Sequence, residues 1–313
     1  MNPTKPSATD FKQSSKTKSS LNFSRFIFGA WRLCDIPEEA NPQAVARKIS
    51  AALEHGITTF DHADIYGDYQ CEEMFGRASS FHNIARDRIQ LISKCGIKLH
   101  SKMRPSHSLK SYDTTATHLI SSVENSLKML KTDYLDALLI HRPDPLMDAE
   151  EMAGAFSTLK KQGKVLNFGV SNFMPSQVSL LQSKMSDPLI SNQIEVSLLQ
   201  TESFYNGQLD QCQEMGMIPM GWSPLAGGRL FVQTDVRTQR LRETLMAMAA
   251  KYKVPSFETI AFAWLLKHPA KIFPVLGTGK TNRIEAAIAS LDVPLERDDW
   301  YQILKASVGH DVA

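Results

Sequence analysis

FIFGAWRLCD, residues 26–35, contains the first predicted strand and separates two α/β folds that the rest of the chain allows. Short apolar runs alternate along the chain with helix-length amphipathic segments, which is typical of βαβ units and a parallel sheet. Such a sheet either stays open and doubly wound or closes into a barrel. A doubly wound dinucleotide-binding sheet usually carries GxGxxG after its first strand, and residues 26–35 lack it. The stretch therefore favours the barrel.

The strand and helix patterns outward from this stretch agree with a barrel. Eight runs are predicted to be strands: residues 26–31, 58–64, 89–95, 137–142, 165–173, 191–197, 218–225 and 273–279. Helical patterns lie between them at residues 42–56, 115–131, 149–163, 175–185 and 206–216. The first helical pattern has Pro42 at its start and Gly56 at its end, as helix boundaries usually do. The order predicts one (β/α)₈ TIM barrel, an α/β fold, over residues 21–313.

Composition limits the partners of the chain. The 313 residues are 42% hydrophobic and 22% charged, as in a globular protein with a sizeable core. A formal net charge of +2 favours a small molecule over nucleic acid or an anionic membrane as the main partner. No run approaches the roughly 18 consecutive apolar residues of a membrane helix.

The N-terminus and the cysteines indicate a cytoplasmic protein. Residues 1–20 are rich in Lys, Ser and Thr and lack the apolar segment of a signal peptide, so we predict a flexible tail there. The four cysteines are scattered, without a CxxC pair or a companion histidine spacing typical of zinc sites. We expect free thiols in a reducing cytosol.

Four polar residues fall at or just after the ends of three successive predicted strands: Asp61 and Tyr66 in TTFDHADIYG, Lys94 in IQLISKCG and His141 in ALLIHRP. The carboxyl ends of barrel strands converge on one mouth, so these residues are expected to meet. Because side chains alternate across a strand, Asp61 shares a face with Thr59, and we expect that face to line the barrel.

These four residue types suit the reduction of a carbonyl group. A phenol has a pKa of about 10, and we expect the Lys94 ammonium to lower the pKa of Tyr66 toward the working range of an acid. Asp61 is expected to hold Lys94 in a partly buried ion pair that keeps the amine protonated. His141 is placed to hydrogen bond to the carbonyl oxygen of a substrate.

The stretch GTGKTNR, residues 277–283, predicts a phosphate site after the last strand. Backbone donors, the dipole of the following helix and two cations all favour a phosphate there. The candidate residues are Gly277, Thr278, Gly279, Lys280 and Arg283. GTGKT resembles the end of a P-loop, but Pro274 stands where a Walker A motif needs its first glycine, which argues against a nucleotide hydrolase.

Several longer motifs together resemble the aldo-keto reductase family, and within it the bacterial YdhF-type oxidoreductases. The similarity covers nearly the whole chain after the tail. It rests on FDHADIYGDYQCEEMFG (60–76), SKCGI (93–97), LIHRPDPLMDA (139–149), GKVLNFGVSNF (163–173), NQIEVS (192–197), WSPLAGGRLF (222–231) and PVLGTGKTNRIEAA (274–287).

The resemblance implies a TIM barrel that binds NADPH without a Rossmann domain. It implies that Asp61, Tyr66, Lys94 and His141 reduce aldehydes or ketones, with Tyr66 as proton donor and hydride from the nicotinamide. Ser171, Asn172 and Gln193 would bind the carboxamide, and Trp222 would stack on the ring. A loop containing Ser223, Leu225, Gly227 and Arg229 would close over the pyrophosphate.

Lys280 and Arg283, the two cations after the eighth predicted strand, favour NADPH over NADH. The chain departs from the commoner family pattern at three positions. The family has Lys where Gly277 stands and Glu-Asn where Ala286 and Ala287 stand. Substrate choice is expected to depend on the loops after strands one, four and seven, with Trp31, Pro143 and Phe173 as candidate walls of the substrate pocket.

Three other functions are compatible with parts of the sequence. Some relatives in this family bind NADPH tightly and act through a partner protein, so a cofactor-sensing regulatory subunit is one alternative. A Schiff-base aldolase that uses Lys94 is another, but it gives Tyr66 and residues 277–283 no role. Asp61, His62 and Asp64 suggest a metal site, but no matching ligands follow the other strands, so we predict no metal.

Overall fold

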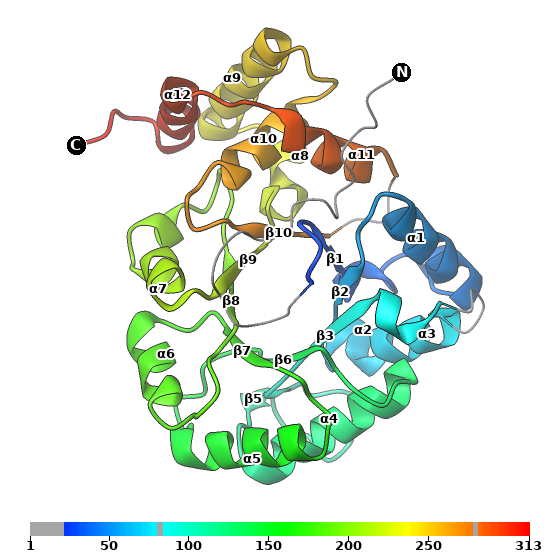
Figure 1. Ribbon diagram of the computed structural model, residues 1–313. Coiled ribbons are helices and arrows are strands. Elements are labelled where there is room, and N and C mark those ends of the chain that lie inside the picture. The colour runs from blue at the N-terminus through cyan, green and yellow to red at the C-terminus, as the bar shows by residue number, and fades with distance from the viewer. Residues whose placement is uncertain (1–21, 80–83, 278–280) are drawn as a thin grey trace, which may run out of the picture.

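The computed structural model describes residues 22–79, 84–277 and 281–313, and the predicted tail at residues 1–20 lies outside them. Eight parallel strands close into a barrel in the order β1-β10-β9-β8-β7-β6-β3-β2 (Figure 1). This confirms the predicted TIM barrel. The strands are β1 (Ile27–Gly29), β2 (Thr59–Asp61), β3 (Gln90–Cys95), β6 (Ala137–Ile140), β7 (Phe168–Ser171), β8 (Ser191–Glu195), β9 (Ile218–Trp222) and β10 (Phe273–Leu276).

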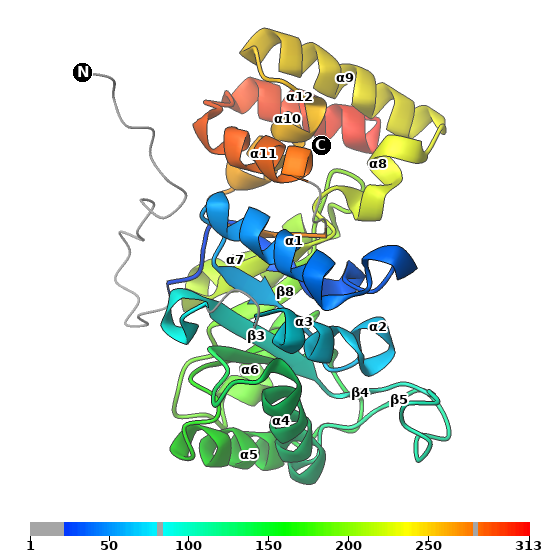
Figure 2. The same cartoon turned by 90° about the vertical axis from the view of Figure 1, so that its right-hand side faces the viewer.

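Helices surround the barrel, and several pack together at one side of it (Figures 1 and 2). They include α1 (Pro42–Glu54), α3 (Cys71–Ser79), α4 (Ala116–Leu130), α5 (Ala149–Lys161), α6 (Pro175–Gln182), α7 (Gln208–Met215), α9 (Val236–Tyr252), α10 (Phe257–Leu266), α11 (Thr281–Ala289) and α12 (Arg297–Val308). The short helices α2 (Tyr66–Tyr69) and α8 (Arg229–Val232) lie in connections that follow β2 and β9. Each of the five predicted helical segments contains a helix.

Local sequence explains where α1 begins and ends. The Asn41 side chain accepts a hydrogen bond from the backbone N–H of Ala44 at 2.9 Å, and Pro42 occupies the first helical position, where no N–H is needed. Gly56 has a φ of +73°, a left-handed conformation that reverses the chain after the helix. This turn directs the chain from α1 into β2.

The alternation of β2 places Asp61 on the inner face of the barrel. Phe60 points outward, where its ring lies 5.7 Å from that of Phe28 and 5.2 Å from that of Phe75 on α3. Asp61 points the other way and lines a cavity. This confirms the predicted direction of the Asp61 side chain.

Apolar side chains fill the barrel interior away from the cavity. Ile27, Ile92, Leu139 and Met220 belong to one buried cluster inside the barrel. Larger clusters of outward-facing strand residues and helix residues form the surrounding core. The cavity that Asp61 lines lies at the carboxyl ends of the strands, where His141 and Trp222 also line it.

The sequence analysis did not predict the hairpin that follows β3. Strands β4 (Ile97–Lys98) and β5 (Ser111–Tyr112) form a two-stranded antiparallel hairpin after β3, and it projects from the barrel in Figure 2. Two-residue strands carry too little alternation to be recognised from sequence.

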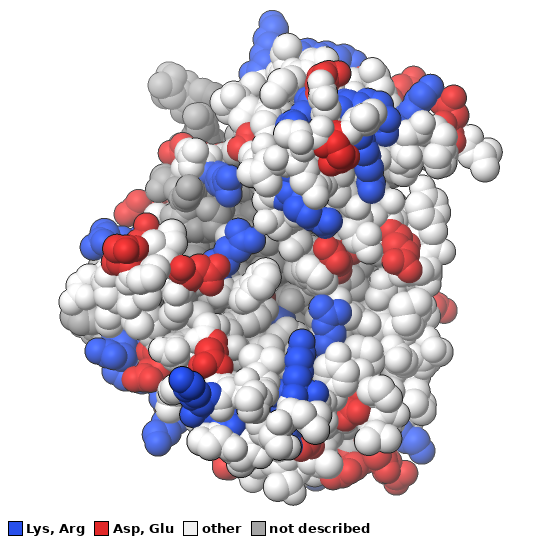
Figure 3. All heavy atoms as spheres, turned by 180° about the vertical axis from the view of Figure 1, so that it is seen from behind, with Lys and Arg blue, Asp and Glu red and all other residues white. Residues whose placement is uncertain are grey.

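The distribution of charged side chains on the surface is consistent with the small net charge of the chain. Figure 3 shows acidic and basic side chains interspersed over one face of the molecule. Within the described parts of the chain, no helix is both long and apolar enough to cross a membrane.

Candidate active site

Lys94 and Asp61 form a fully buried ion pair at the carboxyl ends of β3 and β2. The Lys94 Nζ lies 2.8 Å from each carboxylate oxygen of Asp61, and it also donates to the His62 carbonyl at 2.8 Å. Its fourth partner is the Tyr66 hydroxyl at 3.0 Å. The lysine and aspartate side chains are 0% and 2% exposed. The amine is therefore held in one position, with its charge compensated by Asp61.

Tyr66 occupies the first position after the β2 turn and faces the cavity. Its ring lies 5.7 Å from the His141 imidazole in an edge-on arrangement and 6.5 Å from the Trp31 ring. The next residue, Gly67, has a φ of +58°. The structure thus brings all four predicted catalytic residues together, with Asp61, Tyr66 and His141 on the cavity wall and Lys94 behind them.

The pKa of Tyr66 differs from the sequence expectation. Burial is the largest influence and raises the pKa of this phenol, while the Lys94 ammonium lowers it without cancelling the effect of burial. The net pKa lies above the ordinary value of 10, so Tyr66 is a protonated phenol at neutral pH. Burial lowers the pKa of Lys94, but Asp61 and Tyr66 outweigh this, so the net pKa is raised and the amine stays charged.

His141 is neutral at neutral pH. Burial, followed by the nearby charges of Lys94 and Arg142, lowers its pKa well below the ordinary value of 6.5. Its Nδ1 is buried without a hydrogen-bonding partner among the described residues. A neutral imidazole at this position can hydrogen bond to an oxygen without carrying a charge.

His62 lies outside the barrel interior, as the alternation of β2 predicts. Its ring packs 4.5 Å from Phe75, and neither ring nitrogen has a partner among the described residues. Burial, with a contribution from Lys94, lowers the pKa of His62 to about 3. Glu72, which lies on α3 with Phe75, has its pKa raised to about 7 by burial.

Replacing His62 by leucine is expected to reduce the loss of stability in acid. Because the folded pKa of His62 lies below the unfolded value of 6.5, only the unfolded chain binds this proton between these values. The contribution of neutral His62 to stability is fully present above pH 6.5, and it is lost as the pH decreases toward 3. The unfolding free energy of His62→Leu minus that of wild type should therefore be about 2 kcal/mol larger at pH 5 than at pH 7.

Urea unfolding of both proteins at pH 7 and pH 5 measures this gain. Glu72 contributes with the opposite sign, since its folded pKa is raised, but it is present in both proteins and cancels in the comparison. An equal difference between the two proteins at both pH values would contradict the assignment.

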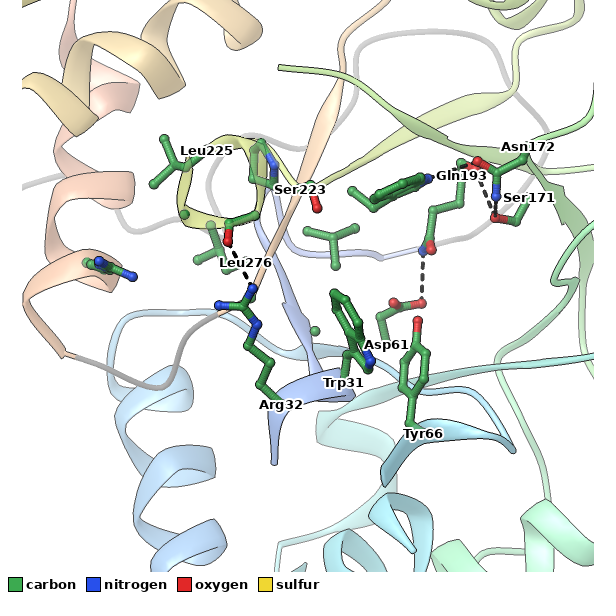
Figure 4. A pocket seen from close by; sticks show the side chains of 18 of the residues that line it. Trp31, Arg32, Asp61, Tyr66, Ser171, Asn172, Gln193, Ser223, Leu225 and Leu276 are labelled. Atoms are coloured by element: carbon green, nitrogen blue, oxygen red, sulfur yellow. Dashed lines mark hydrogen bonds between the residues drawn. The ribbon is translucent and has the colours of Figure 1, made fainter. Parts of the chain in front are cut away.

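Three side chains that the resemblance links to a carboxamide lie together on β7, β8 and the turn after β7 (Figure 4). Asn172 donates to the Ser171 hydroxyl at 2.7 Å, and Gln193 donates to Asp61 at 2.9 Å. The Trp222 indole donates to the Asn172 side-chain oxygen at 3.0 Å. Asn172 has a φ of +61°, a left-handed conformation that Asn tolerates better than most residues. All four residues line the cavity.

The loop after β9 only partly matches the expectation. Ser223, Leu225 and Gly227 line the cavity, and the Gly227 carbonyl accepts a hydrogen bond from Arg32 at 3.0 Å (Figure 4). Arg229 does not line it. Its guanidinium bonds to the Ala226 carbonyl and lies 3.9 Å from Glu195, because the start of α8 turns this side chain away.

The predicted phosphate site is described in part. Gly277 and Arg283 line the cavity, and the Arg283 guanidinium lies 4.3 Å from the centre of the Phe231 ring. Thr278, Gly279 and Lys280 lie outside the described residues.

The structure places Trp31 on the cavity wall and contradicts the predicted position of Phe173. Trp31 lines the cavity and is 55% exposed. Phe173 is 0% exposed and packs in the main apolar core, because its side chain points from the end of β7 toward the helices. Among the described residues, neither Phe173 nor Pro143 lines the cavity.

The cavity also has lining residues that were not identified from the sequence, among them Arg32, Arg142, Phe231 and Phe262. Arg142 follows His141 directly and lies over the Trp222 ring at 5.6 Å. Among the described residues, no carboxylate forms an ion pair with Arg142. Arg32 and Arg142 lie in the loops after the first and fourth barrel strands, and the sequence analysis expected both loops to influence substrate choice.

Comparison with known sequences places the chain in a family. The profile of the Aldo/keto reductase family matches residues 25–307. The chain is 44% identical to the oxidoreductase YdhF of Escherichia coli, over 93% of this chain and 95% of that protein. It is 45% identical to a 6-dehydroglucose reductase of Agrobacterium fabrum, over 94% and 97% of the two chains.

A solved structure has the same fold. An aldo/keto reductase from Klebsiella pneumoniae, crystallised with NADP and acetate, superposes with a TM-score of 0.71 at 25% identity, over 90% of each chain. The barrel, the extent of the profile match and the level of identity agree. The chain belongs to the aldo/keto reductase family and is an oxidoreductase.

Proposed function

We propose that this protein reduces aldehydes or ketones to alcohols with NADPH, using Tyr66 as the general acid. The observation that carries the proposal is the hydrogen bond from the buried Lys94 ammonium to the Tyr66 hydroxyl on the cavity wall. This arrangement sets the protonated phenol of Tyr66 beside the fixed charge of Lys94 and the neutral His141. A carbonyl oxygen could hydrogen bond to Tyr66 and His141 there.

The polar groups in the cavity suit a nicotinamide cofactor. Ser171, Asn172 and Gln193 present hydroxyl and amide groups that can complement a carboxamide, and Trp222 offers an aromatic face. Arg283 in the first turn of α11 supplies a cation for a phosphate. When bound, NADPH would supply the hydride.

The chain's own residues would supply the proton and the oxygen-binding site. His141 donates a hydrogen bond to the substrate oxygen and orients the carbonyl group. Tyr66 releases its proton to this oxygen as negative charge develops on it. Lys94 stabilises the resulting phenolate, and Asp61 keeps the lysine charged.

The same geometry argues against the aldolase alternative. A Schiff base requires a neutral amine with an accessible lone pair. The pKa of Lys94 is raised and its Nζ has four hydrogen-bond contacts, including both oxygens of Asp61. This amine therefore acts as a fixed charge.

Substrate choice is tested with a panel of carbonyl compounds. The relative from Agrobacterium fabrum is named a 6-dehydroglucose reductase, so we include an aldehyde derived from a hexose beside aromatic aldehydes, dicarbonyls and ketosteroids. We expect NADPH consumption with at least one class, and slower consumption with NADH. Tight binding of NADPH with no turnover across the panel would instead support the regulatory-subunit alternative.

Arg283→Ala is expected to raise the KM for NADPH by about tenfold while changing the KM for NADH less, because only NADPH carries the extra phosphate. Steady-state kinetics with each cofactor measures the two changes. Arg297→Ala is the matched control, since Arg297 lies on α12 and is not among the described residues that line the cavity. An equal change with both cofactors would contradict the assignment of Arg283 to that phosphate.

A further inference from the structure

Cys34 and Cys71 meet beside the candidate active site, although they are far apart in the sequence. Cys34 follows the turn that carries Trp31 and Arg32, and Cys71 begins α3. Both sulfurs lie within 3.4 Å of the point that a Cβ atom on Gly67 would occupy. Each thiol influences the pKa of the other, as expected of neighbouring sulfurs. Cys34 is half-buried and Cys71 is buried.

This sulfur pair supports both sides of the cavity wall. Gly67 directly follows Tyr66, and an added Cβ there would lie 2.6 Å from the Cys71 sulfur. The Cys71 thiol also donates to the Trp31 carbonyl at 3.8 Å. The pair therefore lies between the segment that positions Trp31 and the turn that positions Tyr66.

The two thiols differ in their chemistry. The hydrogen bond with Cys71 lowers the pKa of Cys34, whereas the same hydrogen bond and burial raise the pKa of Cys71. The accessible Cys34 is thus the better nucleophile, and the buried Cys71 is held next to it as a second thiol.

We propose that Cys34 and Cys71 form a dithiol site that a small-molecule disulfide, such as glutathione disulfide, oxidises to an intramolecular disulfide. The Cys34 thiolate attacks one sulfur of the small disulfide, which forms a mixed disulfide and releases one thiolate. Cys71 loses its proton and attacks the Cys34 sulfur, which releases the second thiolate. Two cysteine thiols are oxidised and one small disulfide is reduced to two thiols, so atoms and electrons balance.

Closing this bond is expected to disturb the cavity. A disulfide requires the sulfurs to approach to about 2.05 Å with a restricted torsion, and we expect the Cys34 segment or the first turn of α3 to shift to reach this geometry. Both adjoin residues that line the cavity, and small displacements of catalytic groups are costly to rate. This effect on turnover rests on the proposed reductase activity, whereas the thiol chemistry does not.

The test uses the full chain incubated with glutathione disulfide, followed by thiol counting in denaturant and peptide mapping. The four thiols of the wild type should fall to two, with a Cys34–Cys71 crosslink, and carbonyl turnover should fall at least tenfold and return with dithiothreitol. Cys34→Ser should keep its three thiols and its activity. Cys212→Ser, the matched control, should fall from three thiols to one.

Each contrary result is informative. A wild-type protein that keeps four thiols, retains a stable mixed disulfide on Cys34, or crosslinks other cysteines overturns the dithiol site. A Cys34–Cys71 crosslink that leaves turnover unchanged overturns its link to the cavity. If the reduced protein shows no turnover, the reductase proposal fails while the thiol count still decides the dithiol site.

Discussion

Tyr66→Phe is expected to lower kcat for carbonyl reduction by about 10²–10⁴-fold, the range that a positioned general acid contributes. The substitution removes the hydroxyl that Lys94 holds at 3.0 Å and leaves the ring in contact with Trp31 and His141. Cofactor binding should be retained, because the hydroxyl is paired with Lys94 and not with the residues assigned to the cofactor. Steady-state rates and a fluorescence titration with NADPH measure the two properties.

Tyr69→Phe is the matched control for this substitution. Tyr69 is a nearby tyrosine whose hydroxyl accepts a hydrogen bond from the Leu99 backbone N–H at 2.8 Å, and it does not line the cavity with Tyr66. We expect kcat within about twofold of wild type for this variant. Full turnover by Tyr66→Phe, or an equal loss in both variants, would remove Tyr66 from the role of acid.

Lys94→Met is expected to abolish turnover and to destabilise the protein by about 3–5 kcal/mol. Removing one member of a buried ion pair leaves the other charge without compensation, and such losses fall in this range. Here the remaining charge is Asp61, which is 2% exposed. Urea unfolding at pH 7 measures the destabilisation, and the NADPH-oxidation assay measures turnover.

Two further variants separate structure from chemistry at this pair. The double variant Asp61→Asn with Lys94→Met removes both charges and should recover most of the lost stability without recovering turnover. Lys164→Met removes a partly exposed lysine that lies 2.7 Å from the exposed Glu124, and it should cost no more than about 1 kcal/mol. A double variant as unstable as Lys94→Met, or one that regains turnover, would contradict the assigned roles.

The barrel was predictable because the strands and helices have distinct periodicities. Each predicted strand contains a barrel strand, and the alternation of TTFDHAD placed Asp61 inside and His62 outside. The meeting of Asp61, Tyr66, Lys94 and His141 followed from one geometric property, since all four lie at or shortly after the carboxyl ends of neighbouring parallel strands. Their roles in reduction remain proposals.

Side-chain directions at the strand ends were harder to predict. Phe173 lies just beyond β7, where the regular alternation ends, and it points into the core. Arg229 begins a short helix that directs its side chain toward Glu195. Arg32 reaches across the cavity to the Gly227 carbonyl. Contacts of this kind depend on loop conformation, which a periodicity argument does not address.

The sequence also does not specify how deeply a charge is buried. We expected Lys94 to dominate the pKa of Tyr66, but burial has the larger effect and reverses the net direction. The proximity of Cys34 to Cys71 was equally hidden, because it depends on how the segment after β1 packs against the start of α3. Tertiary packing decides both properties.

The transfer of hydride to a carbonyl carbon is the central claim, and isotopic labelling tests it most directly. The protein is incubated with NADPH deuterated at both hydrogens of the nicotinamide C4 and with the best aldehyde of the panel, and the product is examined by mass spectrometry. Our account predicts one deuterium on the alcohol carbon, formed at the wild-type rate and greatly slowed in Tyr66→Phe. Binding of NADPH with no alcohol formed, or an alcohol without deuterium, would contradict it.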